Sequence, residues 1–335
     1  MHDKAIEHYE KALKIRLNIF GTNHSDVAWS YYKLGSSYNN NNQWDIAIQH
    51  YQHALNNGFG DTKLIQISIA NSYNNIGNFY YKANRYNEAI ENYENALKYG
   101  LDNANSAQVN VANSYNNLGE DYENKKIYDK AIEYYEKALK IRLDIFGTNH
   151  PDVAWSYHNL GKSYYYNNQP DKAIEHHEKA LKIRLDIFGT NHVHVADSYN
   201  NLGIPYYDNG QYTKAIEYYE KALEIYLPII GTNHRSTANS YNNLGLAYAS
   251  SKQYDKAIEH HKIALKIRKE LFGDTDKLVG DCNWSLGVAF ENKKETKTAL
   301  EYYKEAYTIY SKVLGESHTD TLKAKTKVNK MGGIV

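Results

Sequence analysis

The chain has 335 residues, and its 39 lysine and arginine residues balance 39 aspartate and glutamate residues. A formal charge of zero gives no electrostatic footprint for nucleic acid or an anionic membrane surface, so we expect neither as a partner. The one cysteine, Cys282, excludes an internal disulfide and suits a reducing compartment, and no apolar run approaches the ~20 residues of a membrane span. Since the N-terminus also lacks the apolar stretch of a signal peptide, these features predict a cytoplasmic protein.

The first predicted element is a helix over residues 1–20. Ala5, Tyr9 and Ala12 have the spacing that recurs in the second helix of each later repeat, here called helix B. Residues 1–24 are therefore predicted to be a partial unit that contains helix B alone.

Residues 25–318 repeat with a period of 42 residues. A Leu-Gly pair, replaced once by Ile-Gly, recurs at this step, and so does an alanine in each helix B. The glycines are Gly35, Gly77, Gly119, Gly161, Gly203, Gly245 and Gly287, and the alanines are Ala5, Ala47, Ala89, Ala131, Ala173, Ala215, Ala257 and Ala299. Periods of 20 to 50 residues indicate solenoids, so we expect one repeat array over residues 1–335, with seven units in 25–318.

Each unit is predicted to contain two helices. Over residues 152–167, apolar and small residues follow helical spacing and define the first helix, helix A. Pro170 suits a first helical turn, and helix B then continues from Asp171 to Phe188. Gly189 and its equivalents are expected to end helix B with a left-handed cap. Gly161 and Ala173 are expected to meet where the two helices pack, with tyrosines filling the sides.

Residues 319–335 are predicted to form a partial closing helix and a tail. Residues 321–328 align with the start of an eighth helix A, but Lys323, Lys325 and Lys327 replace its apolar character. A polar closing helix would cover the otherwise exposed apolar end of the array.

The repeat resembles the tetratricopeptide repeat. The shared pattern is a glycine, a tyrosine three residues later and a break, followed by an aromatic residue, an alanine, a second aromatic residue and a second alanine. In the fifth unit these residues are Gly203, Tyr206, Gly210, Tyr212, Ala215, Tyr219 and Ala222. Three features resemble kinesin light chain repeats in particular: the 42-residue period, the junction at residues 146–154 and the helix B residues Glu-Lys-Ala-Leu. The resemblance implies an all-α, right-handed superhelical solenoid of helix A/helix B hairpins. It also implies that the A helices line a concave groove that binds extended or helical peptides.

The residues expected to face the groove stand at fixed distances from each repeat glycine. They lie six, three and two residues before the glycine, and one, four and five residues after it. Asparagine dominates two of these positions. Two residues before the glycine stand Asn75, Asn117, Asn159, Asn201 and Asn243. Three residues before it stand Asn74, Asn116, Asn200 and Asn242, with His158 in the same series. An asparagine amide donates and accepts at once, which suits a peptide backbone. A coding bias toward asparagine is the alternative explanation.

Aromatic and charged residues complete the expected groove. Trp29 and Trp155 stand six residues before the glycine and could serve as exposed anchors or pack on the preceding helix B. Lys162 and Tyr165 stand one and four residues after it. The inward positions of the seven units hold three lysines against six acids: Lys33, Lys82 and Lys162, and Glu120, Glu123, Asp197, Asp208, Asp281 and Glu291. Because kinesin light chains bind acidic cargo peptides on a basic surface, this balance predicts a different ligand here, a neutral or basic peptide.

The sequence predicts no enzyme, cofactor or metal site. His24, His150, His192 and His234 recur once per unit, too far apart to share an ion, and suit helix entry instead. His177 and His261 replace the core aromatic of helix B. We find no phosphate loop or nucleophile elbow.

These features predict a protein-interaction scaffold. Two alternatives stay open: a kinesin light chain-like cargo adaptor in a motor or cytoskeletal complex, and the regulatory repeat region of a larger signalling enzyme. A relation to the spindle-orientation scaffolds, whose units carry Leu-Gly-Asn, rests only on Ile76-Gly77-Asn78.

Overall fold

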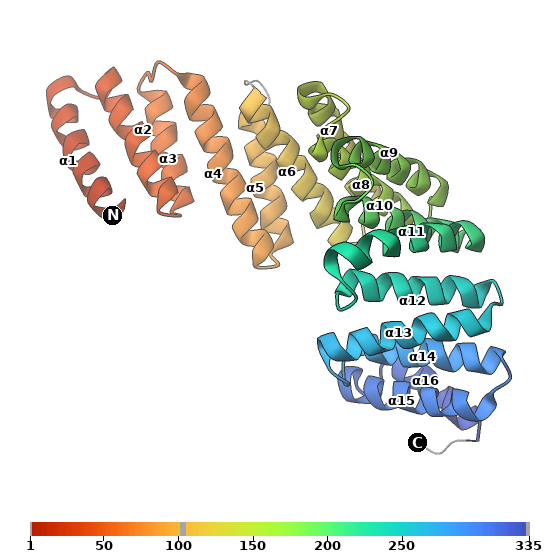
Figure 1. Ribbon diagram of the computed structural model, residues 1–335. Helices are drawn as coiled ribbons and strands as arrows, with labels where there is room; N and C mark the ends of the chain where they lie inside the picture. Colours follow the sequence, from red (N-terminus) through yellow and green to blue (C-terminus); the bar gives the residue numbers. More distant parts are fainter. Residues whose placement is uncertain (1, 101–104, 333–335) are drawn as a thin grey trace. The chain divides into compact units, whose positions relative to one another are not determined.

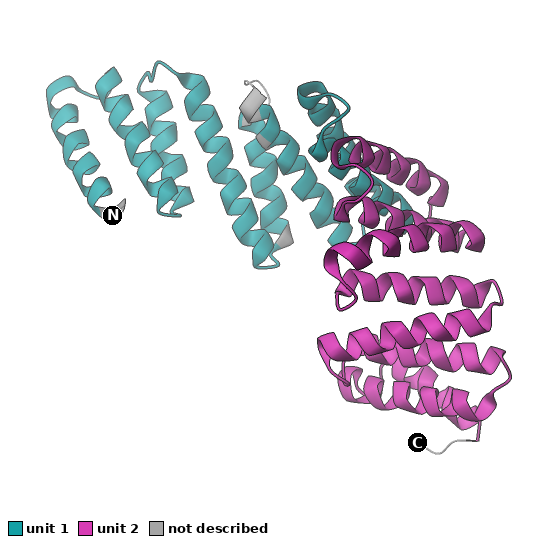
Figure 2. Cartoon of the chain, viewed as in Figure 1, with its two compact units in different colours: residues 1–167 teal, residues 168–335 magenta. Residues whose placement is uncertain are grey.

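A computed structural model describes residues 2–100 and 105–332, which fold into sixteen α-helices with no strand (Figure 1). The chain divides into two compact units, residues 1–167 and 168–335, and each is described by itself (Figure 2). The first unit contains α1 (His2–Phe20), α2 (Ser25–Asn40), α3 (Trp44–Asn56), α4 (Thr62–Lys82), α5 (Tyr86–Gly100), α6 (Asn105–Asn124), α7 (Tyr128–Phe146) and α8 (Pro151–Tyr166). The second contains α9 (Pro170–Phe188), α10 (Val193–Asp208), α11 (Tyr212–Ile230), α12 (Arg235–Ser250), α13 (Tyr254–Phe272), α14 (Lys277–Asn292), α15 (Thr296–Leu314) and α16 (Thr319–Lys330).

The predicted helix alternation is confirmed in both units. The even-numbered helices α2 to α16 are the A helices, and the odd-numbered helices α1 to α15 are the B helices. No helix in residues 2–100 or 105–332 is long and apolar enough to cross a membrane.

A histidine begins many of the A helices. The Nδ1 atom of His150 accepts a hydrogen bond from the Asp152 backbone N–H at 3.2 Å, and its ring stacks on Phe146 with ring centroids 4.0 Å apart. The same cap precedes α2, α10, α12 and α16, where the residues are His24, His192, His234 and His318. The expected helix-entry role is therefore confirmed. Asp61 and Asp276 cap α4 and α14 with a carboxylate oxygen instead.

The predicted cap at the end of helix B is right in part. Gly147 and Gly189 each have φ 73° and ψ −172°, so φ is positive as expected. The ψ value is extended, and the predicted left-handed helical conformation is wrong. Because side chains almost exclude this backbone region, glycine is the residue that suits it.

The repeat glycine lies against the aromatic ring of helix B. A Cβ atom added at Gly119 would lie 2.7 Å from ring atoms of Tyr135, and one at Gly35 would lie equally close to Tyr51. At Gly35 the helix B alanine also approaches, since the carbonyl oxygen of Ala47 would be 3.1 Å from the added atom. The expected contact between two small residues is therefore secondary to the contact between glycine and the ring.

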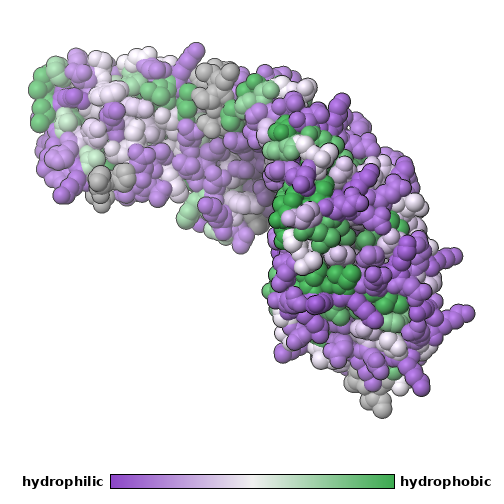
Figure 3. Space-filling model, viewed as in Figure 1, coloured by the Kyte–Doolittle hydropathy of each residue, from purple (hydrophilic) through white to green (hydrophobic). Residues whose placement is uncertain are grey.

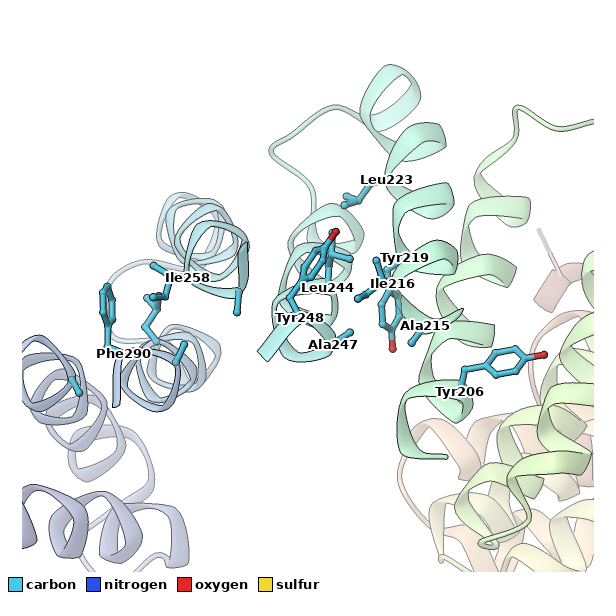
Figure 4. Close-up of a cluster of buried hydrophobic side chains, with 14 of the residues drawn as sticks. Tyr206, Ala215, Ile216, Tyr219, Leu223, Leu244, Ala247, Tyr248, Ile258 and Phe290 are labelled. Carbon is cyan, nitrogen blue, oxygen red and sulfur yellow. The ribbon is translucent and has the colours of Figure 1, made fainter. Parts of the chain in front are cut away.

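Tyrosines fill the core as predicted. Figure 4 shows Leu244 and Tyr248 of α12 pointing toward Ile216 and Tyr219 of α11, within one buried cluster of the second unit. His261 is fully buried and takes the tyrosine position, its ring lying over Gly245. Most of these aromatic rings therefore hold the helices together.

The first and last helices differ in what they expose. Figure 3 shows apolar side chains at the end of α1 farthest from the N-terminus, where Ile15, Ile19 and Phe20 are exposed. In α16, Thr321, Ala324 and Val328 form the buried face, and the lysines lie outside it.

Candidate peptide-binding surfaces

The first unit contains a pocket whose lining is all asparagine. Its volume is about 580 Å³, and α2, α4 and α6 contribute Asn39, Asn71, Asn74, Asn75, Asn78, Asn113 and Asn117. Asn74, Asn75 and Asn117 were expected in the groove. The other four, Asn39, Asn71, Asn78 and Asn113, also stand at expected groove positions, which lie six residues before a repeat glycine or one or four residues after it. They were not among the residues predicted to bind the peptide. We call these seven residues the asparagine pocket.

Hydrogen bonds between neighbouring A helices shape the asparagine pocket. Asn117 Nδ2 donates to Asn78 Oδ1 at 3.2 Å, and Asn75 Nδ2 lies 3.5 Å from Asn39 Oδ1. Asn113 Oδ1 accepts from Arg142, whose guanidinium is buried, at 3.2 Å. These bonds position the side chains. The Oδ1 atoms of Asn39 and Asn78 each accept a second hydrogen bond, from the Ser72 and Tyr93 hydroxyls respectively, so N–H donors are the main groups that these two amides offer a ligand.

A second asparagine pattern links consecutive A helices in two places. Asn159 Nδ2 donates to Asn116 Oδ1 at 3.1 Å, and Asn243 Nδ2 lies 3.5 Å from Asn200 Oδ1. In each pair, the donor stands two residues before the repeat glycine of its own unit. The acceptor stands three residues before the repeat glycine of the preceding unit. Asn159 is only 8% exposed, so its amide supports the stack of helices. Asn201 donates to the backbone oxygen of Asp197 at 2.7 Å.

The two predicted tryptophan anchors are exposed. Trp29 is 42% exposed and stacks on Phe59 with ring centroids 6.0 Å apart, and Lys33 Nζ lies 4.4 Å from its ring centroid. Trp155 is 48% exposed, and its ring centroid lies 5.5 Å from that of His158. Both rings have area available to a ligand.

Lys162 and Tyr165 follow Trp155 on α8. Lys162 Nζ pairs with Glu123 Oε1 at 2.5 Å, so its charge is already matched. Tyr165 is half-buried.

The second unit contains two adjoining pockets near its last helices. One, of about 400 Å³, lies between α12, α14, α15 and α16 and is lined by Asn242, Leu246, Lys277, Asp281, Trp284, Ser285, Tyr310, Asp320 and Lys323. Asn242 is the predicted groove residue in it. The other, of about 450 Å³, shares Trp284 and Lys323 and continues along α16.

The acids expected to make the groove acidic have internal partners. Asp281 pairs with Lys277 at 2.9 Å and accepts from the Tyr310 hydroxyl at 2.9 Å. Glu291 accepts from Lys327 at 2.6 Å and from the Tyr303 hydroxyl at 2.7 Å. Burial alone would raise the pKa of Glu291, but these two hydrogen bonds outweigh it and hold the pKa below its ordinary value. A count of groove charges therefore overstates the negative charge that a ligand meets.

A tetratricopeptide repeat model matches the sequence over residues 1–57, 68–123, 110–186, 167–227, 194–270 and 236–312. The chain belongs to the tetratricopeptide repeat family. The search of curated proteins finds no match.

Several solved structures of this family share the fold. BtubC (BKLC) from P. vanneervenii is 24% identical, with a TM-score of 0.59 over 69% of this chain and 90% of that chain. A putative kinesin light chain from Podosopora anserina with nearly identical TPR-like repeats is 23% identical, with a TM-score of 0.53 over 60% of this chain and 95% of that chain. The apo form of RapI is 17% identical, with a TM-score of 0.54 over 90% of this chain and 99% of that chain. The fold is therefore an all-α tetratricopeptide solenoid.

Proposed function

We propose that this tetratricopeptide repeat protein is a protein-interaction scaffold that binds extended or helical peptide segments against its A helices. The family supports protein binding in general, and the asparagine pocket is the observation that carries the specific proposal. Its amides come from three consecutive A helices, so a ligand that crosses the pocket meets amide groups on each helix in turn. A peptide backbone offers both kinds of group at regular spacing.

We propose a neutral or basic peptide as the ligand, and the uncharged lining of the pocket supports the neutral alternative. Its lining, as far as the structure describes it, contains no ionisable side chain that would attract or repel a charged segment. Binding through amides alone is also expected to change little with salt, because screening acts on charges. Trp29 and Trp155 are proposed as additional anchors for apolar side chains in the first unit.

Affinity capture with paired variants tests this site. Asn75→Ala with Asn117→Ala removes two pocket amides, whereas Asn159→Ala with Asn243→Ala removes two amides that link A helices outside the pocket. Because both double variants lose contacts between A helices, their stabilities are expected to be similar. Partners that the wild type and the second variant retain should be lost from the first. Equal capture by all three proteins would contradict the proposed site.

A kinesin light chain-like cargo adaptor is the second candidate, favoured by the 42-residue period and the structural likeness reported above. Co-purification with a kinesin heavy chain would support a place in a motor complex. Absence of any motor or cytoskeletal protein among the captured partners would count against it. The regulatory region of a larger signalling enzyme remains the third candidate, and the gene sequence upstream tests it.

We further propose that the chain acts without catalysis of its own, as one array in the cytoplasm with seven units in residues 25–318. Among the described residues, no group of three or more histidine, cysteine, aspartate or glutamate side chains could hold a metal ion. Fractionation of cells and a chemical proteomics survey for hydrolase activity would test location and the lack of catalysis.

A further inference from the structure

Two asparagines of the pocket offer a ligand an oxygen atom. The amide nitrogens of Asn75 and Asn117 already donate to neighbouring asparagines. Their Oδ1 atoms accept no hydrogen bond within the part of the chain that the structure describes. Both residues stand two positions before a repeat glycine, on α4 and α6 respectively. The pocket therefore presents one free acceptor on each of two consecutive A helices.

Four other asparagines of the pocket offer N–H groups. The Oδ1 atoms of Asn39 and Asn78 each accept two hydrogen bonds. Those of Asn74 and Asn113 accept from a serine hydroxyl and a buried arginine on neighbouring helices. The Nδ2 groups of these four residues donate to none of the described residues. Among these six asparagines, N–H donors therefore outnumber free oxygens.

The spacing of the A helices selects the conformation of the ligand. Helices that pack side by side are about 8 to 10 Å apart, so equivalent amides on α2, α4 and α6 recur at about that step. A β-strand presents the same face every two residues, or about 6.8 Å, which does not match the step. A polyproline II helix turns once in three residues and rises about 3.1 Å per residue, so the same face returns after about 9.3 Å. That conformation alone keeps one face of the peptide toward successive A helices.

Proline suits the excess of donors. It has a backbone carbonyl but no N–H, so it accepts from the pocket and brings no donor that needs a partner. The free oxygens of Asn75 and Asn117 lie one A helix apart, so they match N–H groups at every third position of a polyproline II segment. An α-helical ligand would satisfy its own backbone groups and leave these amides unused.

We propose that the asparagine pocket binds a proline-rich segment in the polyproline II conformation, with a residue other than proline at every third position. The proposal rests on the proposed function and specifies its ligand class. Two residues three positions apart donate their N–H groups to Asn75 and Asn117, and the carbonyls of the intervening prolines accept from the other amides. Two steps between A helices cover about 16 to 20 Å, which is about six residues of this conformation.

Fluorescence anisotropy with the full chain and labelled nonapeptides tests the proposal. The probe is three repeats of Ser-Pro-Pro. Three comparison peptides replace every proline with alanine, replace every serine with proline, or keep the composition but place the serines next to one another. Each should bind at least about fivefold more weakly than the probe, because each loses the conformation, the N–H groups or their spacing. Raising the salt from about 0.05 to 0.3 M should change the affinity of the probe less than about twofold.

Paired variants locate the binding. Asn75→Ala with Asn117→Ala removes both free oxygens and should lower the affinity of the probe to that of the all-proline peptide. Asn159→Ala with Asn243→Ala is the matched control outside the pocket and should change the affinity less than about twofold. The comparison of the four peptides uses the wild-type chain, so it does not depend on how either variant folds.

The outcomes separate this proposal from the proposed function. Equal binding of the probe and its alanine version, with both lost in the double variant at Asn75 and Asn117, would overturn the proline assignment and leave a peptide site standing. Probe binding that this double variant retains in full would also overturn the proposal, as would tighter binding of the peptide with adjacent serines. If captured partners depend on the pocket but the probe does not bind, the ligand class is wrong and the proposed function stands.

Discussion

Replacing Asp121 with serine is expected to stabilise the protein at pH 8 and to change its stability little at pH 4. Asp121 on α6 is fully buried, and neither of its carboxyl oxygens has a hydrogen-bond partner among the described residues. Burial raises the pKa of this carboxyl to about 7, with Lys125 lowering it and Glu120 raising it. Serine occupies the equivalent positions 37 and 163, so the repeat accommodates the smaller side chain.

The sign and size of the effect follow from proton linkage. The pKa of an unfolded aspartate is about 3.9, and the folded value is higher, so the folded state holds the proton more tightly. The contribution of Asp121 to the free energy of unfolding therefore falls as pH rises from about 4 to about 7, and it is constant above that range. A shift of about three units corresponds to about 4 kcal/mol at about 1.4 kcal/mol per unit. The expected gain from serine at pH 8 is therefore at most about 4 kcal/mol.

Urea unfolding followed by circular dichroism from pH 4 to pH 8.5 measures this effect. Repeat arrays often unfold in more than one step, so hydrogen exchange of α6 amides should accompany the global midpoint. Asp144→Ser on the exposed face of α7 is the matched control, and its effect should not depend on pH in this way. A gain at pH 8 no larger than the gain at pH 4 would refute the assignment of a buried, neutral Asp121.

Three further substitutions test how the repeat is built. Gly119→Ala should lower thermal stability by about 1 to 3 kcal/mol, because the added Cβ would lie 2.7 Å from the Tyr135 ring. Gly60→Ala is the control and should not lower it, because no atom lies within 4 Å of the added Cβ. His150→Ala should remove the cap of α8 and lower the free energy of unfolding in denaturant by about 0.5 to 2 kcal/mol. His150→Asp should retain most of that free energy. Burial lowers the pKa of His261 to about 4, so its contribution to stability should fall as pH drops from about 6.5 to 4, and His261→Phe should remove that contribution from acid-unfolding curves.

The fold could be predicted because the same physical constraint appears in each unit. At six repeat glycines an added Cβ would lie less than 3 Å from the aromatic ring of helix B: Gly35, Gly77, Gly119, Gly203, Gly245 and Gly287. The histidine before helix A and the glycine after helix B mark helix ends through local hydrogen bonding and backbone geometry. Such local rules repeat with the sequence, so periodicity alone locates the helices.

The candidate sites were harder to predict because a groove position does not reveal what its side chain contacts. Asn159 and Asn117 stand at the same offset from their glycines, yet Asn159 is buried against Asn116 and Asn117 lines a pocket. The four additional pocket asparagines stand at expected groove positions but are not part of the recurring pair. Only the packing of α2, α4 and α6 brings all seven together.

Charge shows most clearly why counting residues along the groove is insufficient. Asp281 and Glu291 contribute negative charge to the count, but each is held by a lysine and a tyrosine hydroxyl. Lys323 was interpreted with Lys325 and Lys327 as polarity on a closing helix, although the repeat offset assigns Lys323 to the groove and no described acid forms an ion pair with it. The field that a peptide meets therefore depends on which charges remain unpaired after folding. For this chain that reasoning leaves the asparagine pocket as a surface on which amide hydrogen bonds, and no ionisable side chain of the lining, select the peptide.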